Sequence, residues 1–243
     1  MQSGATMRIE RTRWLATAAA VGLCLCLTLV STPVVRGEAA PTGSINGRVT
    51  LTTRMRGAPI STNAYASRAI DHQSSPPSPE MRAVVVYLKD VTFADDLPTS
   101  TTQIRQEHES FSPRVVAITR GSTVDFPNFD PFFHNVFSLS GTGSFDLGRY
   151  QEGRSRSRAF PKAGIVKVYC HIHSQMSATI VVLDHPYFTI PEADGQFTLT
   201  NVPAGTYTLV GWHERVGEQK TSITVTAGRA ARADISLPVE DPR

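Results

Sequence analysis

From residue 83 onward, short apolar segments alternate with turn-forming residues, and this alternation restricts the chain to a β-sheet fold. Runs such as AVVVYL (83–88) and ATIVVL (178–183) are rich in β-branched residues, and turn-forming residues separate such runs along the chain. No stretch before residue 186 sustains the 3.6-residue apolar period of an amphipathic helix. The sequence therefore predicts an all-β protein.

The strand pattern divides near residue 186, and we expect one sandwich from each block. In the first block, RVVAI (114–118) and TVDF (123–126) are predicted to pair as a hairpin. In the second, short strands are separated by ADG, PAG and TAG, which supply the residues that hairpin turns need. We expect a larger domain over 41–185 and a small C-terminal β-sandwich over 186–243.

A compositional break interrupts the first block at residues 53–79. This segment is rich in Ser, Pro, Ala and Arg and ends in SSPPSP. Such a composition cannot bury a core, so we expect a long exposed or disordered loop.

The N-terminus is typical of a secretory signal. Three arginines within the first 13 residues precede an apolar run (Leu15–Val30), and small residues follow near residue 40. We expect residues 1–40 to be a cleaved signal peptide and the protein to be periplasmic or extracellular. The alternative is a retained anchor, so proximity to a membrane would come only through this leader.

The charge balance gives no reason to expect a nucleic-acid partner. The formal net charge is +3, and residues 1–40 contribute four Arg and two Glu, which leaves 20 basic and 19 acidic residues, or +1. The short basic run GRSRSR (153–158) is predicted to be a solvated loop rather than a phosphate-binding patch.

The number of cysteines predicts a single unpaired thiol in the mature chain. Cys24 and Cys26 lie in the predicted leader, so the mature chain keeps only Cys170 and cannot form an internal disulfide. Burial, intermolecular pairing or metal ligation would each protect a lone thiol in an oxidising compartment.

The segment YCHIHSQM (169–176) favours metal ligation. Cys170, His173 and Met176 are spaced three and three residues apart between two predicted strands, so one turn can direct all three inward. A thiolate, two imidazoles and a weakly bound thioether form the ligand set of blue-copper electron-transfer sites. The set requires a second histidine from elsewhere in the chain.

His134 is the natural candidate for that histidine. It follows the aromatic segment FPNFDPFF (126–133) and begins the apolar run HNVFSL. An apolar shell keeps water from a copper site and tunes its potential. We expect the neighbouring Asn135 to brace the loop near Cys170 through a hydrogen bond.

Residues TVDFPNFDPFFHNVFSL (123–139) and FPKAGIVKVYCHIHSQM (160–176) resemble the cupredoxin family, which includes plastocyanins and amicyanins. The resemblance covers roughly residues 83–184, with a possible first strand at 45–52, and the Cys-x-x-His-x-x-Met spacing is similar to the short loop of amicyanin. It implies a Greek-key β-sandwich and one type 1 copper ion. The implied ligands are His134, Cys170, His173 and Met176.

The same resemblance implies an exported electron carrier that cycles copper between Cu(I) and Cu(II) and docks a redox partner protein. The exposed edge of His173 would be the exit path for electrons, within an apolar patch to which Ile172 and Met176 contribute.

Several alternatives remain open at this site. His171 departs from the family pattern and could add a third imidazole, although alternation along an extended segment predicts that it points away. Zinc would accept the Cys and two His, but a thioether suits copper better. Met176 could instead be a core residue. The remaining histidines, His72, His108, His185 and His213, are expected to be solvated or structural.

The C-terminal block, PYFTIPEADGQFTLTNVPAGTYTLVGWHE (186–214), resembles carboxypeptidase regulatory-like or prealbumin-like sandwiches over about residues 186–238. This resemblance implies a fold and no catalysis.

Three other functions compete with electron transfer. They are copper storage or delivery, a copper enzyme acting on a small molecule, and a cell-surface binding module. The sequence contains no paired carboxylates, nucleophile motif or phosphate loop, so we do not expect an enzyme.

Overall fold

The computed structural model describes residues 41–52 and 79–239, and the chain in these ranges is almost entirely β-strand. The all-β prediction is confirmed. The predicted leader, and the predicted Ser/Pro-rich loop except Pro79, lie outside the described residues. In the described ranges, no helix is both long and apolar enough to cross a membrane.

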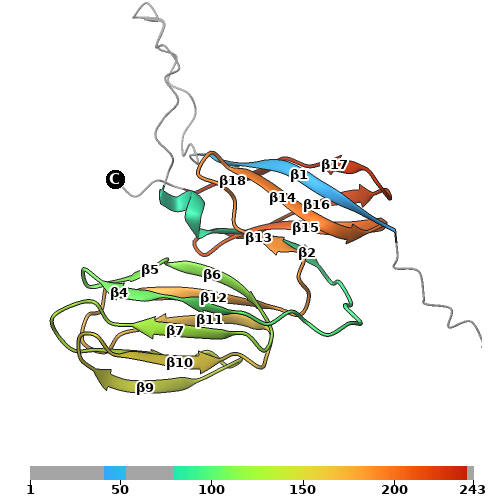
Figure 1. Cartoon of the computed structure of the whole chain (residues 1–243). Coiled ribbons are helices and arrows are strands. Elements are labelled where there is room, and N and C mark those ends of the chain that lie inside the picture. The colour runs from blue at the N-terminus through green and yellow to red at the C-terminus, as the bar shows by residue number, and fades with distance from the viewer. Residues whose placement is uncertain (1–40, 53–78, 240–243) are drawn as a thin grey trace, which may run out of the picture. The chain divides into compact units, whose positions relative to one another are not determined.

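The first sandwich is formed by consecutive strands between residues 101 and 183 (Figure 1). A five-stranded sheet has the order β6-β12-β11-β8-β9, a three-stranded sheet has the order β10-β7-β3, and β4 and β5 form a separate ribbon. The strands are β3 (Thr101–Gln103), β4 (Arg105–Glu107), β5 (Ser110–Ser112), β6 (Val115–Thr119), β7 (Thr123–Pro127), β8 (His134–Ser138), β9 (Phe145–Tyr150), β10 (Ser155–Ala159), β11 (Gly164–Tyr169) and β12 (Ser177–Leu183).

The second sandwich combines strands from both ends of the described chain. One sheet has the order β14-β1-β17, with β18 also paired to β1, and the other has the order β13-β2-β15-β16. Its elements are β1 (Thr42–Leu51), the 3-10 helix η1 (Pro79–Ala83), β2 (Val84–Lys89), β13 (Phe188–Thr189), β14 (Gln196–Pro203), β15 (Gly205–His213), β16 (Gly217–Val225), β17 (Ala230–Arg232) and β18 (Ile235–Leu237).

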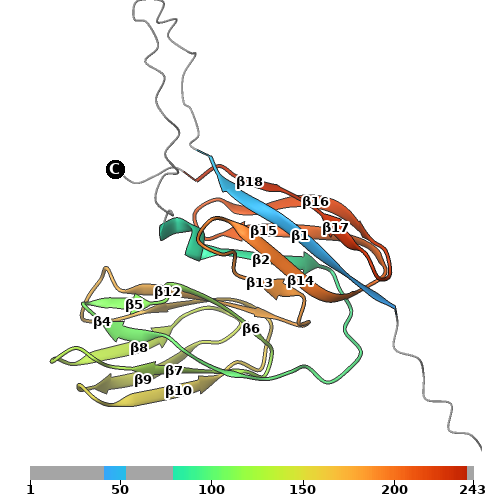
Figure 2. The same ribbon diagram turned by 45° about the horizontal axis from the view of Figure 1, so that its top comes forward.

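The strand pairing departs from the predicted domain limits of 41–185 and 186–243. The blue strand β1 lies among the orange and red strands of the second sandwich, and β2 pairs along its length with β15 (Figures 1 and 2). Residues 42–51 and 84–89 therefore belong to the second sandwich and not to the first. Apolar alternation identifies a strand but does not identify its partner, which explains the difference.

The core of the second sandwich depends on these two early strands. Ile45 and Val49 of β1 and Val84, Val86 and Leu88 of β2 are all at most 1% exposed in one hydrophobic cluster. Complete burial of each such side chain contributes about 1.5–3 kcal/mol, so the C-terminal strands cannot form this core alone.

Two local predictions in the first sandwich are wrong. The segments 114–118 and 123–126 do not pair as a hairpin, because β6 pairs with β12 while β7 pairs with β10 and β3. The turn between them passes through Gly121 at φ +91°, where the chain changes sheets. The run GRSRSR is exposed to solvent, as predicted, but it is not a loop throughout, because Ser155–Arg158 belong to β10.

Candidate metal centre

Three of the predicted ligands come together at one end of the first sandwich. His134 begins β8, and Cys170 and His173 follow β11, which is the neighbour of β8 in the five-stranded sheet. The ligand atoms of these residues all lie within 4.8 Å of one another. Nδ1 of His134 is 3.1 Å from Nδ1 of His173 and 3.9 Å from Sγ of Cys170.

These separations suit one shared metal ion. Bonds of about 2.0–2.1 Å to imidazole nitrogen and about 2.3 Å to thiolate sulfur place the ligand atoms of a four-coordinate site roughly 3.3–3.7 Å apart. The Cys170 thiol is free and only 5% exposed. The group therefore offers a thiolate and two imidazoles in a site that largely excludes water.

Met176 lies beside Cys170 through the backbone of their loop. The Cys170 N–H donates to the Met176 carbonyl oxygen at 3.3 Å, and the Met176 N–H donates to the His173 carbonyl oxygen at 3.0 Å. Met176 is 1% exposed, in the hydrophobic cluster that includes Cys170. Its role as fourth ligand stays a prediction, but its predicted place in an exposed apolar patch is wrong.

Asp130 is a functional residue that the sequence reasoning missed. Its Oδ2 atom lies 2.7 Å from Nε2 of His134, and its two carboxylate oxygens accept backbone N–H groups of His108 and Glu109 at 2.7 and 3.0 Å. Burial alone would raise the pKa of the Asp130 carboxyl, but the hydrogen bonds from His134, Glu109 and His108 outweigh burial and lower that pKa. Asp130 is therefore ionised and orients the His134 ring.

The loop that carries Asp130 is anchored by a buried amide. Nδ2 of Asn128 donates to the carbonyl oxygens of Phe132 and Tyr150 at 2.9 and 3.2 Å, and its Oδ1 accepts the Asp130 N–H at 3.0 Å. Asn128 is buried, so these bonds are shielded from water. The position of Asp130 is thus set before any metal binds.

The predicted brace from Asn135 is confirmed. Oδ1 of Asn135 accepts the backbone N–H of His171 at 2.7 Å, immediately after Cys170. His171 turns away from the group, as predicted: its ring stacks on Phe137 with 3.8 Å between ring centroids, and its side chain is 52% exposed. His171 is not part of the three-residue group.

Aromatic and aliphatic side chains cover the outer side of the group. The Phe132 ring packs against both imidazoles, with centroid distances of 5.2 Å to His134 and 5.5 Å to His173. Phe129, Phe133 and Ile172 are among the exposed large apolar side chains of the described residues. His134 is fully buried while His173 is only partly so, which makes His173 the more accessible imidazole.

The remaining histidines take no part in the group. His108 is exposed, as predicted. His213 and His185 are buried, and His213 pairs with Glu80 at 3.0 Å, which fits a structural role. His72 lies outside the described residues.

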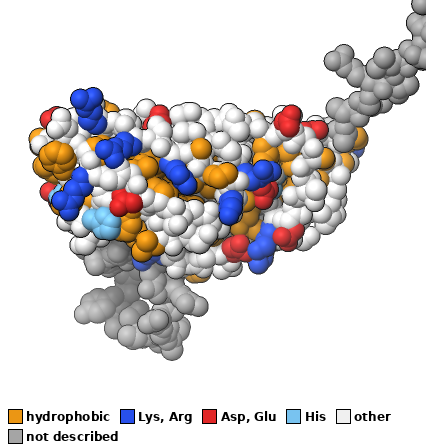
Figure 3. Space-filling view, turned by 90° about the horizontal axis from the view of Figure 1, so that it is seen from below, with side chains coloured by type: hydrophobic (Ala, Val, Ile, Leu, Met, Phe, Trp, Pro, Cys, Tyr) orange, Lys and Arg blue, Asp and Glu red, His pale blue; other side chains and the backbone are white. Residues whose placement is uncertain are grey.

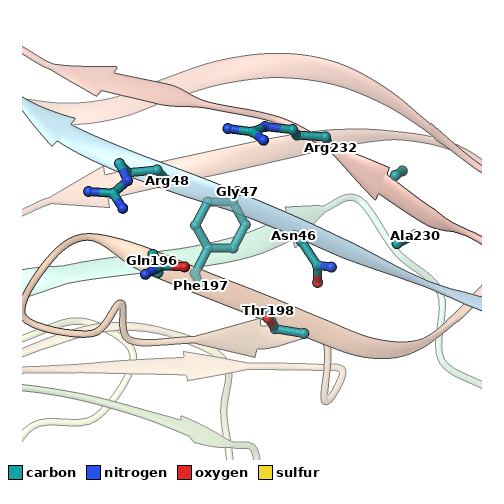
Figure 4. Close-up of a pocket in the computed structure, with 9 residues that line it drawn as sticks. Asn46, Gly47, Arg48, Gln196, Phe197, Thr198, Ala230 and Arg232 are labelled. Carbon is teal, nitrogen blue, oxygen red and sulfur yellow. The ribbon is translucent and has the colours of Figure 1, made fainter.

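A hollow of about 600 Å³ lies elsewhere, on the β14-β1-β17 sheet of the second sandwich (Figure 4). Its arginines, Arg48 and Arg232, lie 3.6 Å from the carboxylates of Asp194 and Asp234. Gly47 lies beside the ring of Phe197, and a Cβ at residue 47 would collide with the Ala233 carbonyl at 1.7 Å. The glycine is therefore explained by close strand packing, and the hollow shows no comparable cluster of reactive groups.

Comparison with known proteins gives limited likenesses. A family model described as polysaccharide lyase family 4, domain II, matches residues 162–233, less than a third of the chain. The match begins just before β11 of the first sandwich and extends through β17 of the second. No curated protein matches the chain. The resemblance of the C-terminal block to carboxypeptidase regulatory-like sandwiches stays a prediction.

Solved structures similar to the chain include copper proteins. A Cu(I) structure of a mutant amicyanin is 19% identical, with 34% of this chain and 82% of that chain covered and a TM-score of 0.33. A purple cupredoxin from Nitrosopumilus maritimus is 24% identical over 34% of this chain and 99% of that chain, with a TM-score of 0.31. A copper-containing nitrite reductase from Thermus scotoductus SA-01 is 26% identical over 39% of this chain and 24% of that chain, with a TM-score of 0.32. Likeness at this level does not assign the chain to a family.

Proposed function

We propose that the chain binds one copper ion in a type 1 site and acts as an electron carrier. The ligands would be His134, Cys170, His173 and Met176. The observation that carries this proposal is the convergence of a buried thiol and two imidazoles within 4.8 Å of one another.

The donor set favours copper over zinc. A thiolate binds both metals, but two imidazoles and a thiolate with a weak axial thioether are the ligand set of trigonal copper sites. A buried methionine closes the same loop as the thiol and one imidazole. Zinc would use the thiolate and imidazoles but gain little from the thioether.

The protein's own residues would hold the donors ready for the metal. Copper, when bound, supplies one-electron chemistry between Cu(I) and Cu(II). Asp130 keeps a proton on Nε2 of His134 and so leaves the Nδ1 lone pair directed toward Cys170. Phe132 packs against both imidazoles and covers part of them, and Asn135 fixes the backbone next to Cys170. Donors fixed by such contacts would move little when the copper ion changes between Cu(I) and Cu(II).

The decisive test is an optical spectrum of the copper-loaded protein. We expect an intense visible band from thiolate-to-Cu(II) charge transfer that bleaches reversibly on reduction. Cys170→Ser should abolish the band, and His134→Ala or His173→Ala should alter it and admit added imidazole. His108→Asn removes an exposed imidazole and tolerates the left-handed backbone of that residue (φ 56°), so this matched control should leave the band unchanged.

The same spectrum separates the competing functions. Met176→Leu should keep the colour and raise the reduction potential, because loss of a weak donor disfavours Cu(II). A copper-delivery protein would hold Cu(I), show no stable colour and release metal to a chelator. An enzyme would have an exchangeable water on the metal, detectable by electron paramagnetic resonance. Either result would count against the electron-carrier proposal, and we propose no catalytic activity.

We also propose that the protein is exported. The basic and apolar N-terminal segments support a cleaved leader and a periplasmic or extracellular location. N-terminal sequencing of the mature protein should find a start between about Gly37 and Gly43. Recovery of intact residues 1–40 in the membrane fraction would contradict cleavage.

A further inference from the structure

The basic residues of the first sandwich fall into two groups. Arg105, Arg114, Arg120 and Lys167 each lie 2.5–3.4 Å from a carboxylate. A second group forms no ion pair among the described residues, and all of its members lie in residues 149–162, a segment with only one acidic residue, Glu152. This unpaired group is Arg149, Arg154, Arg156, Arg158 and Lys162. We call it the basic strip.

The basic strip starts at the end of the sandwich that holds the metal group. The turn between β9 and β10 is bonded to Asn128, which donates its N–H to the Arg154 carbonyl and accepts the N–H of Gly153. Arg149 is paired in register with Asn135 of β8. From there β10 runs along β7, with Arg156 opposite Phe126 and Arg158 opposite Val124, so the strip extends away from the metal group.

Side-chain stacking holds part of the strip in place. The Arg156 guanidinium lies 5.2 Å from the Tyr150 ring centroid, and that of Arg158 lies 5.6 Å from the Phe145 ring centroid. Their spacing of two residues on β10 places both on one face. Figure 3, seen from below relative to Figure 1, shows Lys and Arg side chains interleaved with hydrophobic ones across a broad surface.

Structural support does not explain the whole strip. Arg156 and Arg158 cover aromatic rings, but the side chains of Arg149, Arg154 and Lys162 form no hydrogen bond, ion pair or ring contact with the described residues. Five basic residues with only one acidic residue, Glu152, among them in the sequence repel one another and destabilise the folded chain. An anionic partner would remove that repulsion.

We propose that the basic strip docks the acidic surface of the protein that exchanges electrons with the metal centre, an inference that rests on the proposed function. The strip is connected to the exposed aromatic side of that centre through Asn128, which is followed in the chain by Phe129. The Arg105 guanidinium stacks over Phe129, 5.8 Å from its ring centroid. Arginine and aromatic side chains together are characteristic of protein interfaces. Four of the five basic residues are arginines, which bind carboxylates in a bidentate manner.

The first experiment measures binding without any redox step. The mature chain, both metal-free and copper-loaded, is titrated with poly-L-glutamate and followed by NMR. We expect shifts concentrated at residues 149–162, and the double variant Arg149→Glu/Arg154→Glu should weaken binding at least tenfold. The charge-matched control is the double variant Arg82→Glu/Arg229→Glu, at exposed and unpaired arginines of the second sandwich. It should change the affinity for poly-L-glutamate less than twofold.

The neutral double variant Arg149→Gln/Arg154→Gln keeps the test valid if charge reversal unfolds the chain. It should also weaken binding, by a smaller factor. Equal binding by the wild type and both 149/154 variants would overturn the proposal. Tighter binding to phosphatidylglycerol vesicles than to poly-L-glutamate, lost in the 149/154 variants, would also overturn it by identifying a membrane as the partner.

The second experiment separates the docking surface from the metal function. The reduced, copper-loaded protein is mixed with ferricyanide, an anion, or with tris(phenanthroline)cobalt(III), a cation. At low ionic strength, Arg149→Glu/Arg154→Glu should slow oxidation of the protein by ferricyanide at least tenfold. The same variant should not slow oxidation by the cobalt complex. Equal ferricyanide rates would overturn the docking proposal alone. Failure of the wild type to react with either complex would overturn the electron-carrier function, while the poly-L-glutamate result would still decide the docking surface.

Discussion

The Asp130 carboxylate and the His134 imidazole form a buried pair, with 2.7 Å between Oδ2 and Nε2. An ionised carboxylate can only accept a hydrogen bond, so the proton of the ring lies on Nε2. The opposite nitrogen, Nδ1, then presents its lone pair toward Cys170 and His173. This pair therefore selects the imidazole tautomer that leaves Nδ1 free to bind a metal.

The first prediction tests this selection. Asp130→Asn replaces an acceptor with a group that can also donate, and we expect copper affinity to fall about 10–100-fold, as for other residues that orient a ligating histidine. Chelator competition measures the affinity. Asp184→Asn, in a surface pair with Arg120, is the control and should leave it unchanged. Unchanged affinity in Asp130→Asn would show that orienting the ring does not need an ionised carboxylate.

The second prediction concerns His171. Its ring stacks on Phe137 and points away from the metal group, so His171→Ala should leave the visible spectrum unchanged. Loss of the stacked ring should reduce the free energy of unfolding by about 0.5–1.5 kcal/mol, measured by urea titration. A spectral change as large as that of His173→Ala would mean that a third imidazole reaches the metal.

The third prediction concerns the second sandwich. A fragment of residues 186–243 lacks β1 and β2 and should be unfolded by circular dichroism, because their side chains form part of the core. A chain in which residues 97–184 are replaced by a short Gly/Ser linker should fold, since β2 and β13 are antiparallel neighbours. Cooperative unfolding of the 186–243 fragment would contradict the observed strand pairing.

The fourth prediction concerns acid stability. The hydrogen bond from Lys89, with help from Tyr87 and Lys220, lowers the pKa of Glu218 from 4.5 to about 2. A carboxyl with a lowered pKa in the folded state contributes stability above about pH 4.5, and this contribution is lost as the pH falls toward 2. Glu218→Gln should therefore cost about 0.5–1 kcal/mol at pH 7 and almost nothing near pH 2.

Urea unfolding of the metal-free protein at both pH values measures this difference. Glu192→Gln, at an exposed glutamate with no ion pair among the described residues, is the matched control. An equal effect of Glu218→Gln at pH 7 and pH 2 would assign its cost to something other than charge.

The local chemistry of the candidate site was predictable from the sequence. Cys170, His173 and Met176 lie within seven consecutive residues, so their association needs no knowledge of the fold. His134 is 36 residues away from Cys170 and was chosen because it follows an aromatic segment and begins an apolar run, a choice that the family resemblance then supported. The Asn135 brace followed from its position beside His134 and was also found.

Long-range relationships were not predictable in the same way. The possible first strand predicted at 45–52 is a strand, but nothing in its sequence specifies β14, β17 or β18 as its partners. β10 was missed because all five of its residues are exposed, which removes the alternation that marks a half-buried strand. Asp130 was missed because a carboxylate in a Pro- and Phe-rich turn has no distinctive spacing to the groups it binds.

The order of the strands along the chain determines when each sandwich can assemble during synthesis. The first sandwich is complete in sequence once residue 183 has emerged, so the end of the molecule that carries His134 and Cys170 can form early. β1 and β2 emerge before it but must wait for β14 and β15, the products of the last fifth of the chain. Until then the backbone N–H and C=O groups of β1 and β2 have no partner strands. A chain terminated after residue 184 would leave these groups unpaired permanently. Such a truncated chain would keep the metal ligands yet be prone to aggregation.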